Sequence, residues 1–247
     1  MTTGQVRSWY NERYAAHGVD SMRPAAAYPA FLDLLDARPG ARLLDVSCGA
    51  GLLLRAARDR GVLANGVDLS DAAVRLAHEV APDAGVAVGT GEDLCFRDAA
   101  FDYVTCLGSL EHFLDVGRGL REMQRVATPD ARFCIMVPNR EFAGWWLRGQ
   151  KGTAQQDINE RLLSLGEWRR VFAQEGLDVL TVSPDRWHAI KWRFASRRTV
   201  WGALRGWLLE TAWRLLPLAW EYQFIFVLAR RAPPRSTPPT DARSRAS

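Results

Sequence analysis

A short stretch of the chain combines a carboxylate with a glycine turn. Residues 43–51 read Leu-Leu-Asp-Val-Ser-Cys-Gly-Ala-Gly, an apolar run that ends in a turn and then opens a helical pattern. Because Gly49 and Gly51 have no Cβ, backbone N–H groups at the turn can approach a ligand closely. Asp68 ends the next apolar run, where a carboxylate can accept hydrogen bonds from the two hydroxyls of a ribose. The spacing therefore predicts a ligand that contains a nucleoside.

The residues around the turn restrict the kind of nucleoside. A dinucleotide fingerprint has a third Gly or Ala at the position of Leu54, and the Gly-Lys-Ser/Thr sequence of a nucleotide P-loop is absent. Asp45 precedes the two glycines, and a carboxylate at a strand end suits a cationic ammonium better than a phosphate. We therefore expect a cationic ligand without phosphate. A nicotinamide-dependent oxidoreductase is an alternative against which Leu54 argues.

Three further motifs follow in order. Residues 89–104 read Gly-Thr-Gly-Glu-Asp-Leu-Cys-Phe-Arg-Asp-Ala-Ala-Phe-Asp-Tyr-Val, and Leu110-Glu111-His112 and Val137-Pro138-Asn139 come later. With the glycine turn, they resemble the class I S-adenosylmethionine-dependent methyltransferases of the small-molecule type, with a methyltransferase domain 11-like pattern. The resemblance covers about residues 41–139, with family-like order to Val182 and again over 222–229. Ser47, Thr90 and Cys95 depart from the Gly, Asp and Pro that the family usually has.

The resemblance implies S-adenosylmethionine as the cofactor and a role for each matching residue. The methionine part is assigned to Asp45, Cys48, Gly49 and Gly51, the ribose to Asp68, the adenine to Leu69, Gly91 and Glu92, and the sulfonium border to Leu107 and His112. His112 is also the candidate catalytic base, because an imidazole accepts a proton near neutral pH. The alternative is that His112 caps a helix or packs beside the cofactor.

Candidate substrate-contacting residues lie on segments expected near the carboxyl ends of the strands, where open α/β sheets bind ligands. They are Tyr10, Tyr14, Asn139, Asp157, Asn159 and Glu160. No metal site is predicted. The four cysteines, Cys48, Cys95, Cys106 and Cys134, lie far apart, with no C-x-x-C pair and no His at ligand spacing.

Alternating apolar runs and amphipathic stretches must position these residues. The apolar runs predict strands at 42–46, 62–67, 86–88, 101–107, 132–137, 177–182 and 222–229. Between them, helices are expected at 52–60, 71–80 with Ser70 as N-cap, 116–127, and after the capping-box pattern of Ser164 and Glu167. We predict an α/β fold, a Rossmann-like, seven-stranded, mostly parallel sheet with helices on both faces and the last strand antiparallel.

The predicted domain organisation has four parts. Residues 1–40 form a helical N-terminal cap, and residues 41–185 and 221–230 form the methyltransferase core. Residues 186–220 form an inserted, Trp-rich, basic helical region, and residues 231–247, rich in Pro, Ser and Arg, are predicted to be disordered.

Charge is distributed unevenly along the 247 residues. Residues 185–247 hold 12 Lys/Arg against 4 Asp/Glu, whereas residues 1–184 hold 20 against 24. Residues 186–220 contain six of the ten Trp, and basic, Trp-rich helices can lie on anionic membrane surfaces. We favour a substrate cap for this region, with membrane-surface contact as an added hypothesis. The acidic core argues against a nucleic-acid partner.

The N-terminal residues lack a signal-peptide pattern, and the longest apolar stretch, 200–229, is interrupted by charges. We therefore expect a cytoplasmic protein, with the inner face of the membrane as its site of peripheral contact. The expected reaction is methyl transfer from S-adenosylmethionine to a small molecule or a lipid-linked glycan, on oxygen before nitrogen or carbon. The alternatives are a catalytically silent cofactor-binding partner subunit and a C-methyltransferase of a quinone-like lipid.

Overall fold

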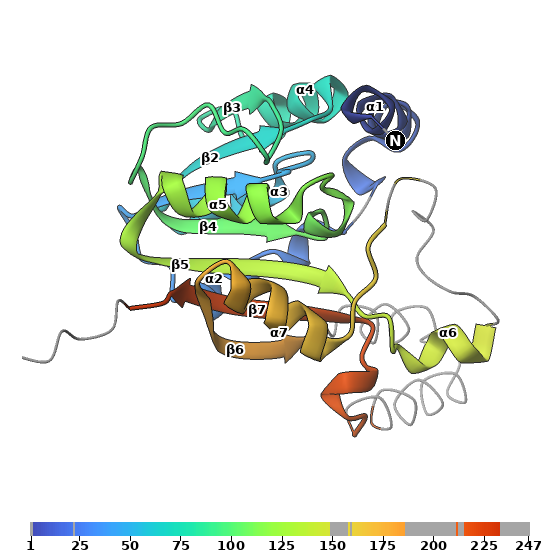
Figure 1. Cartoon of the computed structure of the whole chain (residues 1–247). Coiled ribbons are helices and arrows are strands. Elements are labelled where there is room, and N and C mark those ends of the chain that lie inside the picture. Colours follow the sequence, from blue (N-terminus) through green and yellow to red (C-terminus); the bar gives the residue numbers. More distant parts are fainter. Residues whose placement is uncertain are drawn as a thin grey trace, which may run out of the picture.

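A seven-stranded sheet organises the chain in the computed structural model, which describes residues 2–21, 23–148, 158, 160–185, 211 and 215–232. The strand order is β3-β2-β1-β4-β5-β7-β6 (Figure 1). The strands are β1 (Arg42–Val46), β2 (Leu63–Asp68), β3 (Gly85–Val88), β4 (Phe101–Leu107), β5 (Ala127–Pro138), β6 (Leu177–Pro184) and β7 (Gln223–Arg230).

Strands β1 to β5 pair in parallel, and β7 lies antiparallel between β5 and β6. The predicted fold class is therefore confirmed, including the antiparallel last strand. Strand β5 is longer than the predicted 132–137, because Ala127 already pairs with Phe101 of β4.

Helices connect the strands and flank the sheet. The α-helices are α1 (Thr3–His17), α2 (Pro29–Leu35), α3 (Leu52–Asp59), α4 (Asp71–Val80), α5 (Val116–Val126), α6 (Ala143–Arg148) and α7 (Leu165–Gln174). Short 3-10 helices cover Gly18–Ser21, Ala25–Ala27, Leu110–His112 and Leu218–Trp220. Within the N-terminal region, a 3-10 turn ends at Ala27 and Pro29 opens α2 as a separate helix.

Alternate side chains of each strand pack on opposite faces of the sheet. On β5, Phe133 and Ile135 pack in one core with Trp168 of α7, and α5 covers the same face. Cys134 and Met136 point the other way, into a core formed with α2 and α3. Figure 1 shows α5 and α7 in front of the sheet in this view. The sheet is therefore buried on both faces, as parallel sheets require.

Capping residues set the ends of two helices as predicted. The Ser70 hydroxyl accepts a 3.1 Å hydrogen bond from the N–H of Ala73, which starts α4 directly after β2. Ser164 and Glu167 form the expected capping box of α7. The first turn of α4 is thereby held at the carboxyl end of the sheet.

The order in which successive strands are added to the sheet changes direction between β1 and β4. From β1 the chain proceeds outward through β2 to β3, whereas β4 and β5 lie on the other side of β1. A crevice for ligands is expected at such a switch point, outside the carboxyl ends of the strands. Among the helices that the structure describes, none combines the length and apolarity needed to cross a membrane.

Candidate active site

A cavity of about 340 Å³ lies at the carboxyl ends of the parallel strands. Its walls come from α1, the turn after β1, the end of β2, residues 89–92, residues 107–114, Met136 and the start of β7. Eleven predicted site residues line it, namely Tyr10, Tyr14, Asp45, Cys48, Gly49, Asp68, Leu69, Gly91, Glu92, Leu107 and His112. This is the size and place of a small-molecule site in an open α/β fold.

In the turn after β1, every second residue from 47 to 51 has a left-handed backbone conformation. Ser47, Gly49 and Gly51 have φ values of 62°, 54° and 76°. Ser47 therefore adopts a conformation that favours glycine, which is the residue the family usually has there. A Cβ on Gly51 would lie 3.0 Å from Cα of Ala77 in α4. Gly51 thus packs against α4 and does not line the cavity.

Asp68 is buried at the end of β2 and ties the turn to α4. One carboxylate oxygen accepts a 2.8 Å hydrogen bond from the N–H of Gly49, and the other accepts one of 2.8 Å from the N–H of Ser70. Burial raises the pKa of Asp68 to about 6, and the two backbone hydrogen bonds oppose that rise. Each oxygen retains a lone pair, so Asp68 can also accept bonds from a ligand diol.

Asp45 lies at the end of β1 and is almost fully buried. Its carboxylate accepts a 2.6 Å hydrogen bond from the Thr105 hydroxyl of β4. Burial raises the pKa of Asp45 to about 7, the Thr105 hydrogen bond lowers it, and the Asp68 charge raises it further. Two acidic side chains thus face one cavity, which favours a cationic ligand.

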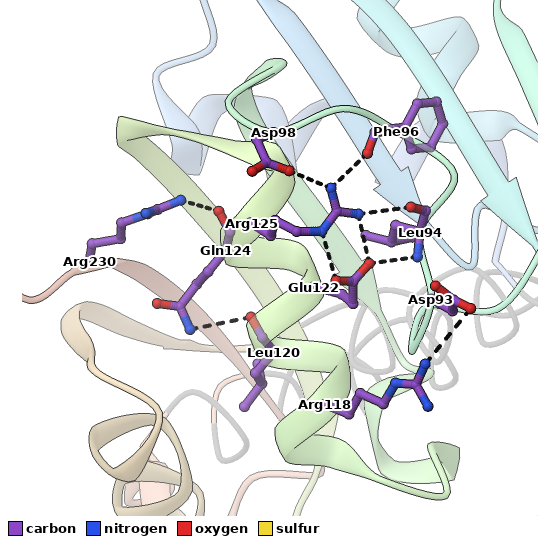
Figure 2. A network of polar contacts seen from close by, with 10 residues as sticks. All are labelled: Asp93, Leu94, Phe96, Asp98, Arg118, Leu120, Glu122, Gln124, Arg125 and Arg230. Carbon is purple, nitrogen blue, oxygen red and sulfur yellow. Dashed lines mark hydrogen bonds and ion pairs between the residues drawn. The ribbon is translucent and has the colours of Figure 1, made fainter.

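A network on α5 holds the loop that follows Gly91 and Glu92. The Arg125 guanidinium donates to the carbonyls of Leu94 and Phe96, each at 2.8 Å, and pairs with Asp98 and Glu122 (Figure 2). Glu122 in turn accepts from the N–H of Leu94 at 2.8 Å. Glu92 accepts a 2.9 Å hydrogen bond from the N–H of Asp115. This wall of the cavity is therefore anchored to α5 at several points.

Helix α1 closes the cavity from the side of α4. Arg7 pairs with Asp71, and the Asn11 carbonyl oxygen accepts hydrogen bonds from the Ser70 hydroxyl at 2.6 Å and the N–H of Ala72 at 3.2 Å. These contacts place Tyr10 and Tyr14 over the turn after β1. Burial raises the pKa of both phenols, so both stay protonated at neutral pH.

Comparison with known proteins supports the family that the motifs indicate. A family model for a methyltransferase domain matches residues 44–135. The ubiquinone biosynthesis O-methyltransferase of Pseudomonas entomophila is 31% identical over 162 residues, which cover 59% of this chain and 70% of that protein. The chain belongs to the class I S-adenosylmethionine-dependent methyltransferases.

Other relatives of this methyltransferase match over shorter regions or share its fold. The nocamycin O-methyltransferase of Saccharothrix syringae is 36% identical over 133 residues, which cover 51% of this chain and 47% of that protein. The match to this first relative thus spans about half of its length. The geranyl diphosphate C-methyltransferase of Streptomyces coelicolor superposes with a TM-score of 0.66 at 17% identity, over 93% of this chain and 98% of that one. At that identity the likeness shows the fold alone.

S-adenosylmethionine is the cofactor of this family, and the cavity of the methyltransferase fits it. The ligand carries a ribose diol, an ammonium and a sulfonium. The cavity offers the buried carboxylates of Asp68 and Asp45. At Gly49, a Cβ would lie 2.6 Å from the Tyr14 hydroxyl, so a side chain at this point of the wall would have to displace Tyr14. The donor set and the shape of the turn therefore match the chemical groups of the cofactor.

His112 and its neighbour Glu111 form another wall of the cavity. Nδ1 of His112 lies 3.2 Å from the carbonyl oxygen of Ile158, and its ring packs edge-on to Tyr10 at 6.3 Å between centroids. Glu111 is 3% exposed and lines the cavity. The sequence reasoning missed Glu111, although a Glu between an apolar residue and a His directly after a buried strand is a visible signal.

The structure does not bring every predicted substrate residue to the cavity. Asn139 is fully buried outside it, and its amide donates to the carbonyls of Ala219 and Glu221 at 2.7 and 2.8 Å. Its side chain therefore holds the chain before β7 rather than facing a ligand. Glu160 is half-buried beside the wall. Asp157 and Asn159 lie outside the described residues, as do most of residues 186–220 and 231–247.

Proposed function

We propose that the protein transfers a methyl group from S-adenosylmethionine to a hydroxyl oxygen of a small molecule. The observation that carries this proposal is that Asp45, Asp68 and the glycine turn line the same cavity as Glu111 and His112. A cofactor held by the first group would share the cavity with polar side chains on the opposite wall. By their names, the nocamycin and ubiquinone relatives are both O-methyltransferases.

Within this proposal, each wall of the cavity has its own task. Asp68 would accept the ribose hydroxyls, Leu69, Gly91 and Glu92 would border the adenine, and Asp45 would face the ammonium together with the backbone of Cys48 and Gly49. Leu107 and His112 would border the sulfonium. The bound cofactor supplies an activated methyl carbon, and the protein aligns the acceptor oxygen with it and excludes water.

Helix α1 supports the exclusion of water. Tyr14 is 7% exposed and its hydroxyl lies against Gly49 of the turn, whereas Tyr10 is half-buried and its ring packs on His112. Because Arg7 and Asn11 fasten α1 to the start of α4, the two rings are held over the cavity. Their proposed role is to contact the acceptor or cofactor from above.

A lipid-linked acceptor, such as a glycan intermediate at the inner membrane face, is the second candidate. It is favoured by two exposed apolar side chains in the last residues of the basic, Trp-rich region, Leu215 at 80% and Trp220 at 52% exposure. Apolar side chains next to a basic segment are suited to an anionic membrane surface. This candidate changes the acceptor but not the methyl transfer.

The test is a turnover assay with S-adenosylmethionine labelled in its methyl group and a panel of phenols, catechols and lipid-linked sugars. We expect S-adenosylhomocysteine to form together with a labelled methyl ether, and Asp68→Ala to need a higher cofactor concentration for the same turnover. A labelled product with the methyl on carbon would favour the C-methyltransferase alternative. Tight cofactor binding without turnover on any acceptor would favour the silent binding subunit and contradict the proposal.

A further inference from the structure

Glu111 is a buried carboxyl group with one oxygen that has no partner within the described structure. It lies in the 3-10 helix Leu110–His112, directly after β4, and its Oε2 atom is buried without a hydrogen bond to any described group. Buried polar atoms in folded proteins are nearly always paired, because leaving one unpaired forfeits its hydration without a compensating hydrogen bond. Because Glu111 lines the cavity, its missing partner is expected to be a ligand.

The groups that face Glu111 come from several elements and are mostly acidic or neutral. They include Tyr10 of α1, Cys106 of β4, the neighbouring His112, and Glu160. The backbone carbonyl of Glu111 accepts a 2.8 Å hydrogen bond from the N–H of Arg161, which holds the segment around Glu160 against this helix. A second carboxylate beside Glu111 makes this part of the cavity unfavourable for an anionic acceptor.

The surroundings keep the Glu111 carboxyl protonated in the absence of a cation. Burial raises its pKa to about 8, a hydrogen bond from its own backbone N–H opposes the rise, and the Glu160 charge adds to it. Asp45 faces the same cavity, and the charges of Asp45 and Glu111 both raise the pKa of the Cys106 thiol. A positive charge placed in the cavity would therefore act on both carboxyl groups and favour their ionised forms.

We propose that Oε2 of Glu111 accepts the proton of the acceptor hydroxyl during methyl transfer, an inference that rests on the function proposed above. The hydroxyl oxygen forms a bond to the methyl carbon while the carbon–sulfur bond breaks and the sulfur keeps the electron pair. The hydroxyl proton passes to the Glu111 carboxylate. The acceptor is accordingly a neutral hydroxyl compound, a phenol or an alcohol, rather than a carboxylate.

His112 is the other candidate for this task. Its Nδ1 atom faces the carbonyl oxygen of Ile158, so it must carry a proton to donate there, and the ring edge packs on Tyr10. In this tautomer Nε2 is the ring nitrogen of His112 that can accept a proton, so the two candidates are separated by experiment. Glu111 also lines the cavity, and its Oε2 atom, which is unpaired within the described residues, is buried in the cavity wall.

The cationic cofactor and the proton acceptor are coupled in this scheme. The sulfonium charge of S-adenosylmethionine lowers the pKa of Glu111 and so releases its proton before transfer, whereas the neutral thioether of S-adenosylhomocysteine does so much less. At pH 8, close to the pKa of about 8 for Glu111, half of these groups still hold a proton. Complete ionisation would then release about 0.5 proton per site.

The test is calorimetric titration of the full chain with S-adenosylmethionine and with S-adenosylhomocysteine at pH 8, each in two buffers of different ionisation enthalpy. The buffer dependence gives the number of protons released. We expect wild type to release about 0.5 proton more than Glu111→Gln with S-adenosylmethionine, and nearly the same number with S-adenosylhomocysteine. Asp45 and the ligand amine release the same number of protons in wild type and in Glu111→Gln. They therefore do not contribute to the difference between the two proteins.

His112→Gln is the matched variant, and it should retain the release that Glu111→Gln loses. Equal release by wild type and Glu111→Gln would overturn the inference, and so would loss of the release in His112→Gln instead. If Glu111→Gln does not fold, difference infrared spectroscopy of wild type and Glu111→Asp replaces it. We expect a protonated carboxyl band that S-adenosylmethionine removes in wild type, and that is shifted in Glu111→Asp. An unchanged band would overturn the inference.

Failure of the proposed function gives a different result. If folded wild type binds neither ligand, the cofactor site itself is refuted. If it binds both ligands with no proton release that depends on Glu111, only the role of Glu111 is refuted.

Discussion

The hydroxyl of Tyr14 lies where a side chain at position 49 would project. A Cβ built on Gly49 would come within 2.6 Å of that oxygen, and Gly49 has a φ of 54°. The observed packing of Tyr14 against the glycine turn after β1 therefore depends on residue 49 having no side chain. The same N–H of Gly49 donates to Asp68, which links the two walls of the cavity.

Gly49→Ala should weaken binding of S-adenosylhomocysteine by about tenfold or more. The new methyl group must displace Tyr14, and alanine at a positive φ costs about 1–2 kcal/mol by itself. The measurement is calorimetric affinity together with thermal unfolding. Gly166→Ala is the matched control, because nothing lies within 4 Å of its Cβ position in α7. Wild-type affinity in folded Gly49→Ala would contradict this account of the turn.

Ser47→Gly should stabilise the protein by about 0.5–1 kcal/mol, because Ser47 has a φ of 62° and glycine adopts such a conformation without a steric penalty. Chemical denaturation measures the change. Ala99→Gly, at a φ of 51° outside the cavity lining, should give a similar gain. Cofactor affinity should change only a few-fold in Ser47→Gly. A large loss of affinity would mean that the serine hydroxyl itself binds the ligand.

The free energy of unfolding of the ligand-free protein should fall as pH rises from about 4 to about 8. Burial raises the pKa of Asp68 to about 6, of Asp45 to about 7 and of Glu111 to about 8. In this range the unfolded chain has already released protons that the folded chain still holds, so ionisation favours unfolding. Arginine partners lower the pKa of Asp71, Asp102 and Glu122. The ionisation of these three groups makes the free energy of unfolding rise with pH, and this effect lies below about pH 4.5.

Glu111→Gln should flatten the upper part of this pH dependence and raise stability at pH 8 relative to wild type. Chemical denaturation at a series of pH values provides the measurement. The exposed Glu79→Gln serves as control and should follow the wild-type curve. A wild-type slope between pH 6 and 8 in Glu111→Gln would show that Glu111 is not the buried acid responsible.

Arg125→Met should weaken binding of S-adenosylhomocysteine by about 5–30-fold, which corresponds to the loss of about 1–2 kcal/mol of charge-assisted hydrogen bonding. The substitution removes the bonds to the carbonyls of Leu94 and Phe96 and so loosens the loop after Glu92. Arg118→Met is the matched control on the same helix, because its contact with Asp93 is 3.7 Å and exposed (Figure 2). Equal affinities of the two variants would argue against a positioning role for Arg125.

Much of the fold was predictable because its signals are local. Apolar runs bounded by glycine and proline mark the strands, and Ser70 and Ser164 lie at helix starts where their hydroxyls cap the first turn. The docking of α1 was not predictable. It depends on Asn11 and Ser70, which are 59 positions apart, and no periodic pattern connects them.

The cofactor side of the cavity was easier to predict than the acceptor side. Asp45 and Asp68 lie at the ends of β1 and β2, and Gly49 lies in the turn after β1. Their positions along the chain therefore determine where they meet. The sequence predicts that Asn139 lies near the end of β5, but it does not predict the direction of its amide. In the structure the amide donates to the carbonyls of Ala219 and Glu221. The Leu110-Glu111-His112 pattern was visible in the sequence, but the unpaired oxygen of Glu111 is a property of the packed structure.

The central claim is that the cavity binds S-adenosylmethionine through Asp68, and calorimetric titration with S-adenosylhomocysteine tests it most directly. We expect wild type to bind and Asp68→Ala to bind about 5–130-fold more weakly, the effect of losing about 1–3 kcal/mol from a buried hydrogen-bonding partner. Asp102→Ala, which breaks the pair with Arg42 at the opposite end of the sheet, should bind like wild type. No binding by folded wild type, or equal binding by folded Asp68→Ala, would contradict the account.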